Sequence, residues 1–247
     1  MDNRSIDINI SNISILIDGC KELGIFLSGK QIEQFTTYYR MLYEKNQVMN
    51  LTAVTEWNDV QKKHYLDSLL LCRTVDLTKD LRILDMGTGA GFPGIPLKIA
   101  FPNLDIVLAD SLRKRILFLD DVIRELNLTG IRTVHGRAED LGRNKEYRES
   151  FDLVVSRAVA NLSSLSEYCL PIVKTGGVFI SYKSEEIEEE LNGARKAIRI
   201  LGGGNPDVVT LPLPCSDMMR SFVIVPKERP VPGKYPRKAG IPKKDPL

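Results

Sequence analysis

Apolar side chains in the first third of the chain recur at helical spacing. The apolar positions among residues 13–23 are three or four residues apart, with Ser11 or Asn12 before them as a candidate N-cap. Gly24 follows the last apolar position, where a helix is expected to stop. The pattern therefore predicts a first helix within this range.

Two further helical segments follow. Ser28 and Gln31 form the sequence signature of a capping box, and a one-sided apolar pattern continues from it. The Leu-rich residues 60–72 also have a helical pattern, and no alternating strand pattern precedes residue 82. The sequence thus predicts a helical N-terminal extension over residues 1–75.

From residue 82 the chain alternates between short apolar strands and amphipathic helices. Such alternation predicts parallel strands joined by right-handed helical crossovers. Ser184 is placed to cap the last of these helices. The predicted strands are 82–86, 105–109, 131–134, 151–156 and 178–182, and the predicted helices are 112–126, 162–170 and 184–201.

The last two predicted strands break this alternation. Residues 208–213 and 222–225 are separated by a loop too short for a helical crossover, so the two strands should pair antiparallel. A mostly parallel seven-stranded sheet that ends in an antiparallel hairpin is an α/β fold typical of class I, Rossmann-like methyltransferases. We expect this domain to span residues 76–226, followed by a tail at 227–247.

A glycine-rich loop follows the first predicted strand directly. Residues 87–94 contain four glycines, which suit a sharp turn that brings the backbone close to a ligand. Gly89, Gly91 and Gly94 satisfy the G-x-G-x-x-G fingerprint of dinucleotide sites, so the loop alone leaves a nicotinamide cofactor open. Asp110 ends the second strand, where a carboxylate accepts ribose hydroxyls in either kind of site.

Three features favour S-adenosylmethionine over a dinucleotide. Asp85, Gly87 and Gly89 have the acidic-glycine spacing of methyl-donor sites, and the terminal hairpin does not suit a dinucleotide fold. Ala138 and Glu139 follow the third strand, where methyltransferases place groups against the adenine. The residues therefore predict a methyl-donor site.

The charge of the chain is unevenly distributed. The 34 Lys and Arg against 32 Asp and Glu give +2 overall, but residues 227–247 hold seven basic and two acidic side chains. We expect this proline-rich tail, with Arg237 and Lys238, to stay extended along RNA phosphates. A second candidate phosphate contact opens the helix after the second strand and consists of Arg113, Lys114 and Arg115.

Other features of the sequence exclude several classes of protein. No apolar run approaches the roughly 18 residues that span a bilayer, and no secretory signal opens the chain. The four cysteines are scattered, which favours a reduced, cytoplasmic protein without a disulfide framework or a metal site. No association helix is evident, so we expect a monomer.

Several motifs in order along the chain resemble one family. From about residue 50 to the C-terminus the chain is similar to the glucose-inhibited division protein B family, bacterial methyltransferases that modify N7 of a guanine in 16S ribosomal RNA. The motifs are Asn50-Leu51-Thr52, His64-Tyr65-Leu66-Asp67-Ser68, residues 85–96, Asp110-Ser111 with Lys114-Arg115, Ser156-Arg157-Ala158 and the ending 235–242 with Pro246-Leu247.

The resemblance implies a donor, a partner and site residues. It implies S-adenosylmethionine as donor and 16S ribosomal RNA or the small ribosomal subunit as partner. It places His64 and Asp67 on the substrate side, whereas Arg157 is open to a donor carboxylate, a phosphate or the guanine edge. The implied donor contacts are Gly87, Phe92, Ala138, Glu139 and Arg157.

Guanine N7 carries an exposed lone pair, so direct transfer needs no general base and no metal. Cys215 follows a proline as in covalent cytosine methyltransferases, but it lies between the last two strands, so we expect no covalent step. Two alternatives remain open from the sequence. One is methylation of another RNA or a small molecule, and the other is a catalytically silent RNA-binding protein.

Overall fold

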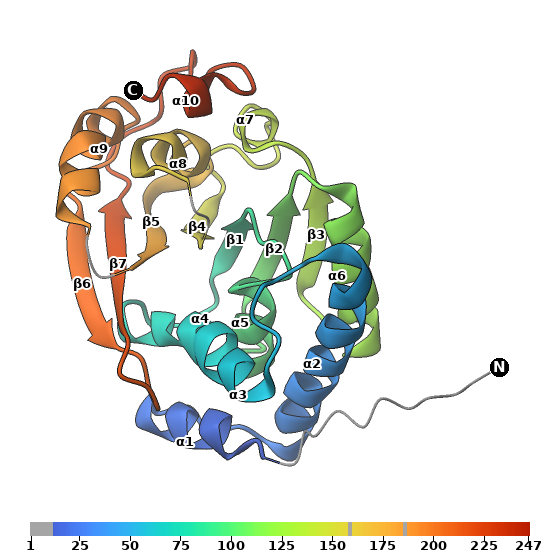
Figure 1. Cartoon of the computed structure of the whole chain (residues 1–247). Coiled ribbons are helices and arrows are strands. Elements are labelled where there is room, and N and C mark those ends of the chain that lie inside the picture. Colours follow the sequence, from blue (N-terminus) through green and yellow to red (C-terminus); the bar gives the residue numbers. More distant parts are fainter. Residues whose placement is uncertain (1–11, 158–159, 185–186) are drawn as a thin grey trace.

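A seven-stranded sheet forms the centre of the molecule (Figure 1). The computed structural model describes residues 12–157, 160–184 and 187–247, so Ser11 and Ala158 lie outside the described residues. The strand order is β3-β2-β1-β4-β5-β7-β6. The strands are β1 (Arg82–Met86), β2 (Asp105–Asp110), β3 (Ile131–His135), β4 (Phe151–Ser156), β5 (Val173–Lys183), β6 (Asp207–Pro212) and β7 (Met219–Pro226).

The strand directions confirm the predicted fold class. Strands β1 to β5 pair parallel with one another, and β7 pairs antiparallel with both β5 and β6. The hairpin therefore closes the sheet as expected, with β7 inserted beside β5 and β6 at the edge. This is the mostly parallel sheet with one terminal hairpin that the alternation of elements predicts.

The helices of the first third match the predicted segments. The capping box at Ser28 and Gln31 is present, and Asn12 Oδ1 accepts from the Ser14 amide ahead of the first helix. The third segment is one continuous helical stretch that includes a π-helical turn. Its parts, with the first two helices, are α1 (Ser14–Glu22), α2 (Gly29–Met49), α3 (Trp57–Val60), the π-helix η1 (Gln61–Leu66), α4 (Asp67–Leu69) and the 3-10 helix η2 (Leu70–Arg73).

Three of the remaining helices, α6 (Arg113–Glu125), α8 (Leu162–Cys169) and α9 (Glu188–Ile200), correspond to the predicted crossovers. The two largest differences in boundary are that α9 begins at Glu188 with no side-chain cap, so Ser184 is not its N-cap, and that β5 begins at Val173. Lys183 ends β5 and forms an ion pair with Glu190 of α9 at 2.7 Å, which links the two elements directly. The helices are α5 (Gly94–Ala100), α6 (Arg113–Glu125), α7 (Ala138–Leu141), α8 (Leu162–Cys169), α9 (Glu188–Ile200) and α10 (Ile241–Lys244).

The two faces of the sheet are buried in separate apolar clusters. Ile83 of β1 belongs to the cluster that includes α2 and the helical stretch 57–73, and its neighbour Leu84 belongs to the cluster that includes α8 and α9. Successive strand residues point to opposite faces, which explains this division. The N-terminal helices therefore share a core with the sheet and have no described core of their own. None of the described helices has the length and apolar character that crossing a membrane requires.

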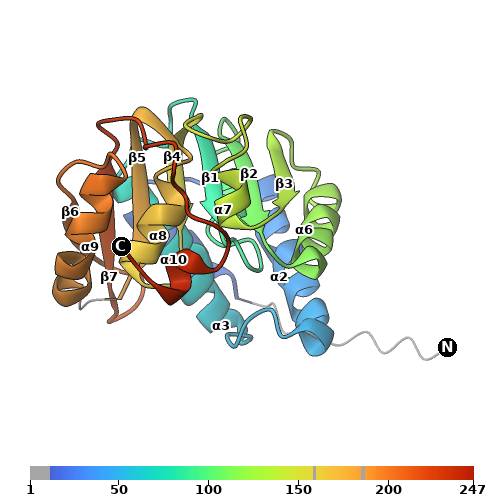
Figure 2. The ribbon, with the colours of Figure 1, turned by 90° about the horizontal axis from the view of Figure 1, so that it is seen from above.

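The C-terminal tail is packed against the domain, so the expectation of a free, extended tail is wrong. Val231 and Tyr235 are buried in the α8–α9 cluster, and Arg148 donates to the carbonyls of both. Figure 2 shows the tail running past α7 and α8 to α10. Because apolar residues alternate with its prolines, the tail has an apolar side that it buries, which a reading of its charges and prolines misses.

Lys227, the first cation of this tail, is a structural residue. Its Nζ is buried and donates to Glu149 Oε1 at 2.9 Å and to the carbonyls of Leu170 and Val173 at 2.9 and 3.0 Å. Burial lowers the pKa of this amine, while the bond to Glu149 opposes that shift. One of the positive charges counted for the tail is therefore buried and paired inside the fold.

Replacing Lys227 with alanine should destabilise the protein. Three acceptors would lose their buried donor, so we expect a loss of about 2–4 kcal/mol. At this chain length that lowers the melting temperature by about 5–10 °C in differential scanning calorimetry. Lys244→Ala removes an exposed cation of the same tail and should leave the melting temperature unchanged. Equal melting temperatures for both variants would contradict the structural role of Lys227.

Candidate functional site

The glycine loop turns sharply at the carboxyl end of β1. Gly87 and Gly89 have φ values of +71° and +62°, a region that favours glycine. Gly91 is also crowded, since a Cβ there would lie 2.7 Å from Tyr38 Oη and from the Ile95 side chain. The loop therefore needs glycine for its turn and for its close contact with α2 and α5.

A pocket of about 490 Å³ opens beside this loop; we call it the β1–β3 pocket. It brings together Gly87, Asp110, Ala138 and Glu139, which lie at or just after the carboxyl ends of three different strands. Parallel strands present their carboxyl ends at one edge, so residues that follow them converge. The lining residues are Met86, Gly87, Ala109, Asp110, Ser111, Leu112, Gly136, Arg137, Ala138, Glu139, Ser156, Ala160, Leu165, Tyr168, Gly240 and Lys243.

The Asp110 carboxylate is buried and closely hydrogen-bonded. Its Oδ2 accepts from the Gly89 amide at 3.0 Å and from Arg115 Nη1 at 3.1 Å, and its Oδ1 accepts from the Leu112 amide at 2.8 Å. A carboxylate offers about four acceptor positions, so one remains for a hydroxyl in the pocket. Arg115, a predicted phosphate contact, is thereby paired with Asp110, whereas Arg113 and Lys114 are exposed at the start of α6.

Glu139 connects the pocket to the C-terminal tail. Its side chain is buried, and Oε1 accepts from the Gly240 amide at 2.8 Å. Lys243 of α10 also lines the pocket. Gly240 and Lys243 are pocket residues that the sequence analysis missed, because nothing in the local pattern shows where the tail docks.

Asp85 of β1 lies under the glycine loop. Its Oδ2 accepts from Thr88 Oγ1 at 2.7 Å and from the Gly94 amide at 2.9 Å, but its buried Oδ1 has no partner among the described residues. Burial raises the pKa of this carboxyl to about 6, against the lowering effect of its two hydrogen bonds. A buried acceptor without a partner is costly, and it is a group that a ligand or a bound water would satisfy.

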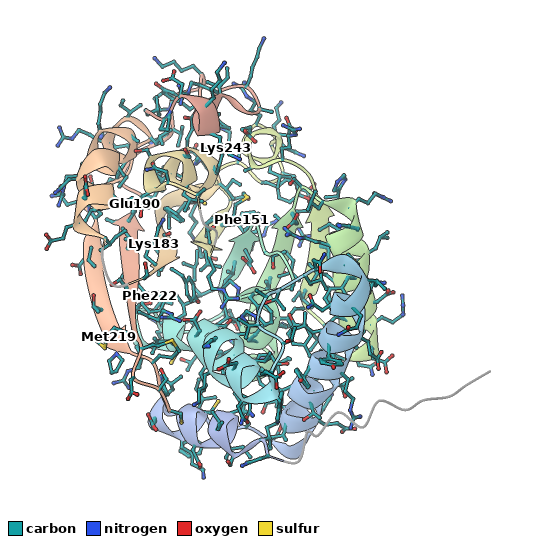
Figure 3. All side chains as sticks on the ribbon, viewed as in Figure 1. Phe151, Lys183, Glu190, Met219, Phe222 and Lys243 are labelled. Carbon is teal, nitrogen blue, oxygen red and sulfur yellow. The ribbon has the colours of Figure 1, made fainter. Side chains whose placement is uncertain are left out.

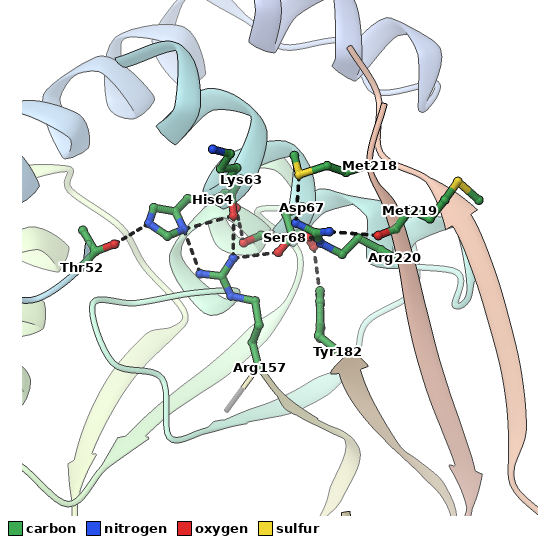
Figure 4. A network of polar contacts seen from close by, with 10 residues as sticks. All are labelled: Thr52, Lys63, His64, Asp67, Ser68, Arg157, Tyr182, Met218, Met219 and Arg220. Carbon is green, nitrogen blue, oxygen red and sulfur yellow. Dashed lines mark hydrogen bonds and ion pairs between the residues drawn. The ribbon is translucent and has the colours of Figure 1, made fainter. Parts of the chain in front are cut away.

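Arg157 lies outside the β1–β3 pocket, in a polar network with the helical stretch 57–73 (Figure 4). Its Nη1 donates to Asp67 Oδ2 at 2.8 Å and to the Lys63 carbonyl at 3.0 Å, and its guanidinium carbon lies 5.0 Å from the centre of the Phe92 ring. Phe92 also lies outside the β1–β3 pocket. The π-helical turn supplies the Lys63 carbonyl, and such turns often occur at functional sites.

His64 is held as a neutral ring by contacts to both of its nitrogens. Nδ1 lies 3.1 Å from Arg157 Nη2 and 3.1 Å from the Lys63 carbonyl oxygen, and Nε2 lies 2.8 Å from Thr52 Oγ1. The ring stacks on Phe92 with centroids 4.3 Å apart. Burial, assisted by the charge of Arg157, lowers the pKa of His64 to about 3. His64 thus supports the position of Arg157 and remains uncharged.

A second arginine completes this network. Arg220 Nε donates to Asp67 Oδ1 at 2.6 Å, so the buried Asp67 carboxylate is held between Arg157 and Arg220 (Figure 4). Sequence reasoning missed Arg220, because it lies 153 residues from Asp67 and shows no local motif. Only the docking of β7 beside β5 brings the two side chains together.

The network forms a wall of a second pocket of about 510 Å³, the β4–β5 pocket. This pocket shares Ala160 with the β1–β3 pocket, so the two lie side by side past the end of β4. Two adjacent pockets at one sheet edge can hold two reactants together. The lining residues are Asp67, Arg157, Ala160, Asn161, Tyr182, Lys183, Ser184, Glu190 and Arg220.

The remaining candidates lie elsewhere. Arg237 is engaged by Glu167 at 2.7 Å, whereas Lys238 is exposed. Cys215 Sγ lies 3.6 Å from the Ile15 carbonyl of α1, and burial raises the pKa of its thiol. Within the described part of the chain, no group of three or more His, Cys, Asp or Glu side chains is arranged to hold a metal ion.

The neutral His64 predicts a pH dependence of stability. Its folded pKa of about 3 lies below its usual 6.5, so the unfolded chain binds the extra proton and stability is lost as the pH falls below 6.5. Asp85 acts in the opposite direction, because its raised pKa favours the folded state as the pH falls below about 6.

Comparing the wild type with His64→Gln separates the effect of His64 on stability from that of Asp85. The Asp85 effect is common to both chains and cancels in the difference between them. We expect the stability advantage of the wild type to fall by up to about 1.4 kcal/mol per pH unit between pH 6.5 and 5. Urea unfolding at several pH values measures this difference, and a constant difference would show that His64 titrates normally in the folded protein.

Known proteins with this architecture include methyltransferases. A methyltransferase from Pyrococcus furiosus superposes with a TM-score of 0.53 at 17% identity, covering 65% of this chain and 81% of that one. The YcgJ protein from Bacillus subtilis superposes with a TM-score of 0.51 at 14% identity, covering 67% of this chain and 100% of that one. At these identities the likeness supports the fold alone.

Sequence comparison is more specific. Residues 31–217 match the family model described as rRNA small subunit methyltransferase G. A protein named ribosomal RNA small subunit methyltransferase G from Lachnoclostridium phytofermentans is 51% identical, covering 95% of this chain and 97% of that protein. One of the same name from Alkaliphilus oremlandii is 50% identical, covering 94% and 98%. The chain therefore belongs to the rRNA small subunit methyltransferase G family.

Proposed function

We propose that this chain transfers a methyl group from S-adenosylmethionine to N7 of a guanine in 16S ribosomal RNA. The observation that carries the proposal is the pair of adjacent pockets at the end of β4, which share Ala160. One pocket has groups suited to a nucleoside-like donor, and the other has arginine donors suited to a base or phosphate. Family membership supports methyl transfer to ribosomal RNA.

The β1–β3 pocket fits S-adenosylmethionine on the chemistry of its residues. Asp110 has an acceptor position for a ribose hydroxyl, and Glu139 adds a second buried carboxylate to the pocket lining. Carboxylates also suit a donor that carries a positive charge on sulfur. When bound, this donor supplies a methyl group already activated for transfer.

The β4–β5 pocket is the candidate guanine site. Guanine presents N7 and O6 as acceptors on one edge, and arginine is the side chain that pairs best with that edge. Arg157 and Arg220 line the pocket, each held by Asp67. We propose that Arg157 orients the guanine, with His64 and Phe92 holding the guanidinium in place.

The reaction we propose needs positioning and exclusion of water rather than a base. N7 attacks through its own lone pair, so no proton must leave before transfer. His64 is suited to this arrangement, because both of its ring nitrogens are engaged by Arg157 and Thr52 and its pKa is about 3. We expect the enzyme to act on 16S ribosomal RNA or the small ribosomal subunit, as a monomer in the cytoplasm.

Mapping N7-methylguanine in ribosomal RNA tests the proposal. Reductive cleavage at methylated guanines in RNA from a deletion strain should show one 16S site missing, restored by the wild-type gene. Purified protein with labelled donor should methylate small subunits or 16S RNA from that strain. If every N7 mark remained in the deletion strain, the substrate assignment would fail, and transfer to another RNA would then be the alternative to test.

The placement of Cys215 predicts that it is dispensable. Its thiol is held against α1 with a raised pKa, so a nucleophilic thiolate is disfavoured. Cys215→Ala should therefore keep methyl transfer within about twofold of wild type in a labelled-donor assay, since it removes no group from either pocket. Complete loss of transfer with an unchanged melting temperature would instead indicate covalent catalysis.

A further inference from the structure

The C-terminal residues 237–244, which we call the closing segment, form part of the β1–β3 pocket. Gly240 and Lys243 line that pocket, and the Gly240 amide donates to Glu139 Oε1 at 2.8 Å. Figure 3 shows Lys243 beneath α10, beside α8 and α7. The closing segment thus reaches a pocket built by strands more than 100 residues earlier in the chain.

An ion pair anchors the start of this segment. Arg237 Nε donates to Glu167 Oε1 at 3.0 Å, Nη2 donates to Oε2 at 2.7 Å, and the Arg237 amide donates to Oε1 at 2.7 Å. The Glu167 side chain is fully buried in α8. A two-pronged arginine–carboxylate pair fixes orientation as well as distance, so the segment leaves α8 in a defined direction.

Two more contacts hold the far end of the segment. Ser164 Oγ of α8 donates to the Pro242 carbonyl at 2.7 Å, and Arg237 Nη2 donates to the Asp245 carbonyl at 2.7 Å. Arg237 and α8 thereby hold α10 over the pocket. Because these contacts pair the Arg237 guanidinium within the protein, this residue is not available to an RNA phosphate while the segment is docked.

We propose that the closing segment is a wall of the donor site and that its role is to hold S-adenosylmethionine, rather than to lie along RNA. The proposal rests on the proposed function, because it takes the β1–β3 pocket to be the donor site. Gly240 positions the Glu139 carboxylate, and Lys243 covers the pocket and limits access of water. Docking of the segment and binding of the donor must then strengthen each other by the same factor.

Two adjacent lysines provide a matched test. Both side chains are exposed, but Lys243 lines the pocket and the next residue, Lys244, does not. Calorimetry with S-adenosylhomocysteine as probe should give a Kd raised about threefold by Lys243→Ala and unchanged by Lys244→Ala. A chain that ends at Arg237 should bind this probe at least about tenfold more weakly, with its melting temperature recorded as a check of folding.

A second readout uses the wild-type chain. Trypsin cleaves after lysine, so Lys238, Lys243 and Lys244 report how well the segment is docked. Saturating S-adenosylhomocysteine should slow cleavage at these lysines about tenfold, as reciprocity requires, while cleavage at Lys21, whose side chain is exposed on α1, serves as the internal control. A segment that only stabilises the fold would show no such protection.

Each contrary outcome has a distinct meaning. Equal weakening by Lys243→Ala and Lys244→Ala would indicate a simple charge effect and overturn the proposal. If the shortened chain kept its donor affinity but bound a 16S RNA fragment more weakly, the segment would be an RNA contact. That result would also overturn the proposal. If the wild-type chain bound no S-adenosylhomocysteine, the proposed function itself would fail.

Discussion

Arg157→Ala should reduce kcat/KM for methyl transfer to 16S RNA by about 100- to 1000-fold. The reason is geometric: Arg157 lines the β4–β5 pocket, and loss of a group that orients one of two reactants costs about this much. Donor affinity should change little, because Arg157 does not line the β1–β3 pocket. Single-turnover transfer assays and calorimetry with S-adenosylhomocysteine measure the two effects separately.

The variant should also remain folded. Asp67 keeps its bond to Arg220 Nε at 2.6 Å, so its buried carboxylate still has a charged partner after Arg157 is removed. Arg124→Ala on α6 is a matched control, since Arg124 is exposed and its carboxylate partner, Asp121, is half-exposed. Unchanged turnover in Arg157→Ala would show that Arg157 does not orient the guanine. A large decrease in melting temperature would instead indicate that Arg157 has a structural role.

Asp110→Ala should weaken donor binding about 100-fold. The variant loses the carboxylate that is open to a ribose hydroxyl and the acceptor that fixes the Gly89 amide at 3.0 Å. Hydrogen bonds to a charged group are worth about 1.5–3 kcal/mol each, so loss of one or two accounts for this factor. Calorimetry with S-adenosylhomocysteine measures the change in Kd directly.

Asp105→Ala provides the matched control on the same strand. Asp105 begins β2, at the opposite end from Asp110, and its carboxylate is exposed with distant partners at 3.7 and 3.9 Å. This variant should bind the probe as the wild type does. If Asp110→Ala bound S-adenosylhomocysteine with wild-type affinity, the β1–β3 pocket would not be the ribose site, and the assignment of the donor pocket would need revision.

Local patterns were sufficient to predict the architecture. The capping box at Ser28 and Gln31, the strand at 82–86 and the glycine loop are each encoded by residues close together in sequence. Right-handed crossovers then leave few ways to arrange alternating strands and helices, so the parallel sheet with its terminal hairpin follows. For the same reason, the convergence of Gly87, Asp110 and Glu139 on one pocket was predictable.

The second pocket was less accessible to sequence reasoning. His64 and Asp67 are three residues apart, which suggests a local pair, yet each contacts Arg157 instead. Arg157 was a plausible donor contact by position, but the structure places it on the other side of Ala160, with Arg220 as its counterpart across Asp67. Contacts between residues 90 and 153 positions apart depend on how the elements pack, and no local periodicity records them.

By itself, the sequence determined the order and type of the elements, the glycine loop and its acidic partners, because these depend on local spacing and on the direction of parallel strands. Only the tertiary structure determined which groups the charged side chains contact. Lys227 and Arg237 looked like cations for RNA, but burial against Glu149 and Glu167 makes them anchors of the tail. A charge acts on whatever group folding brings within hydrogen-bond distance, and only packing determines that group.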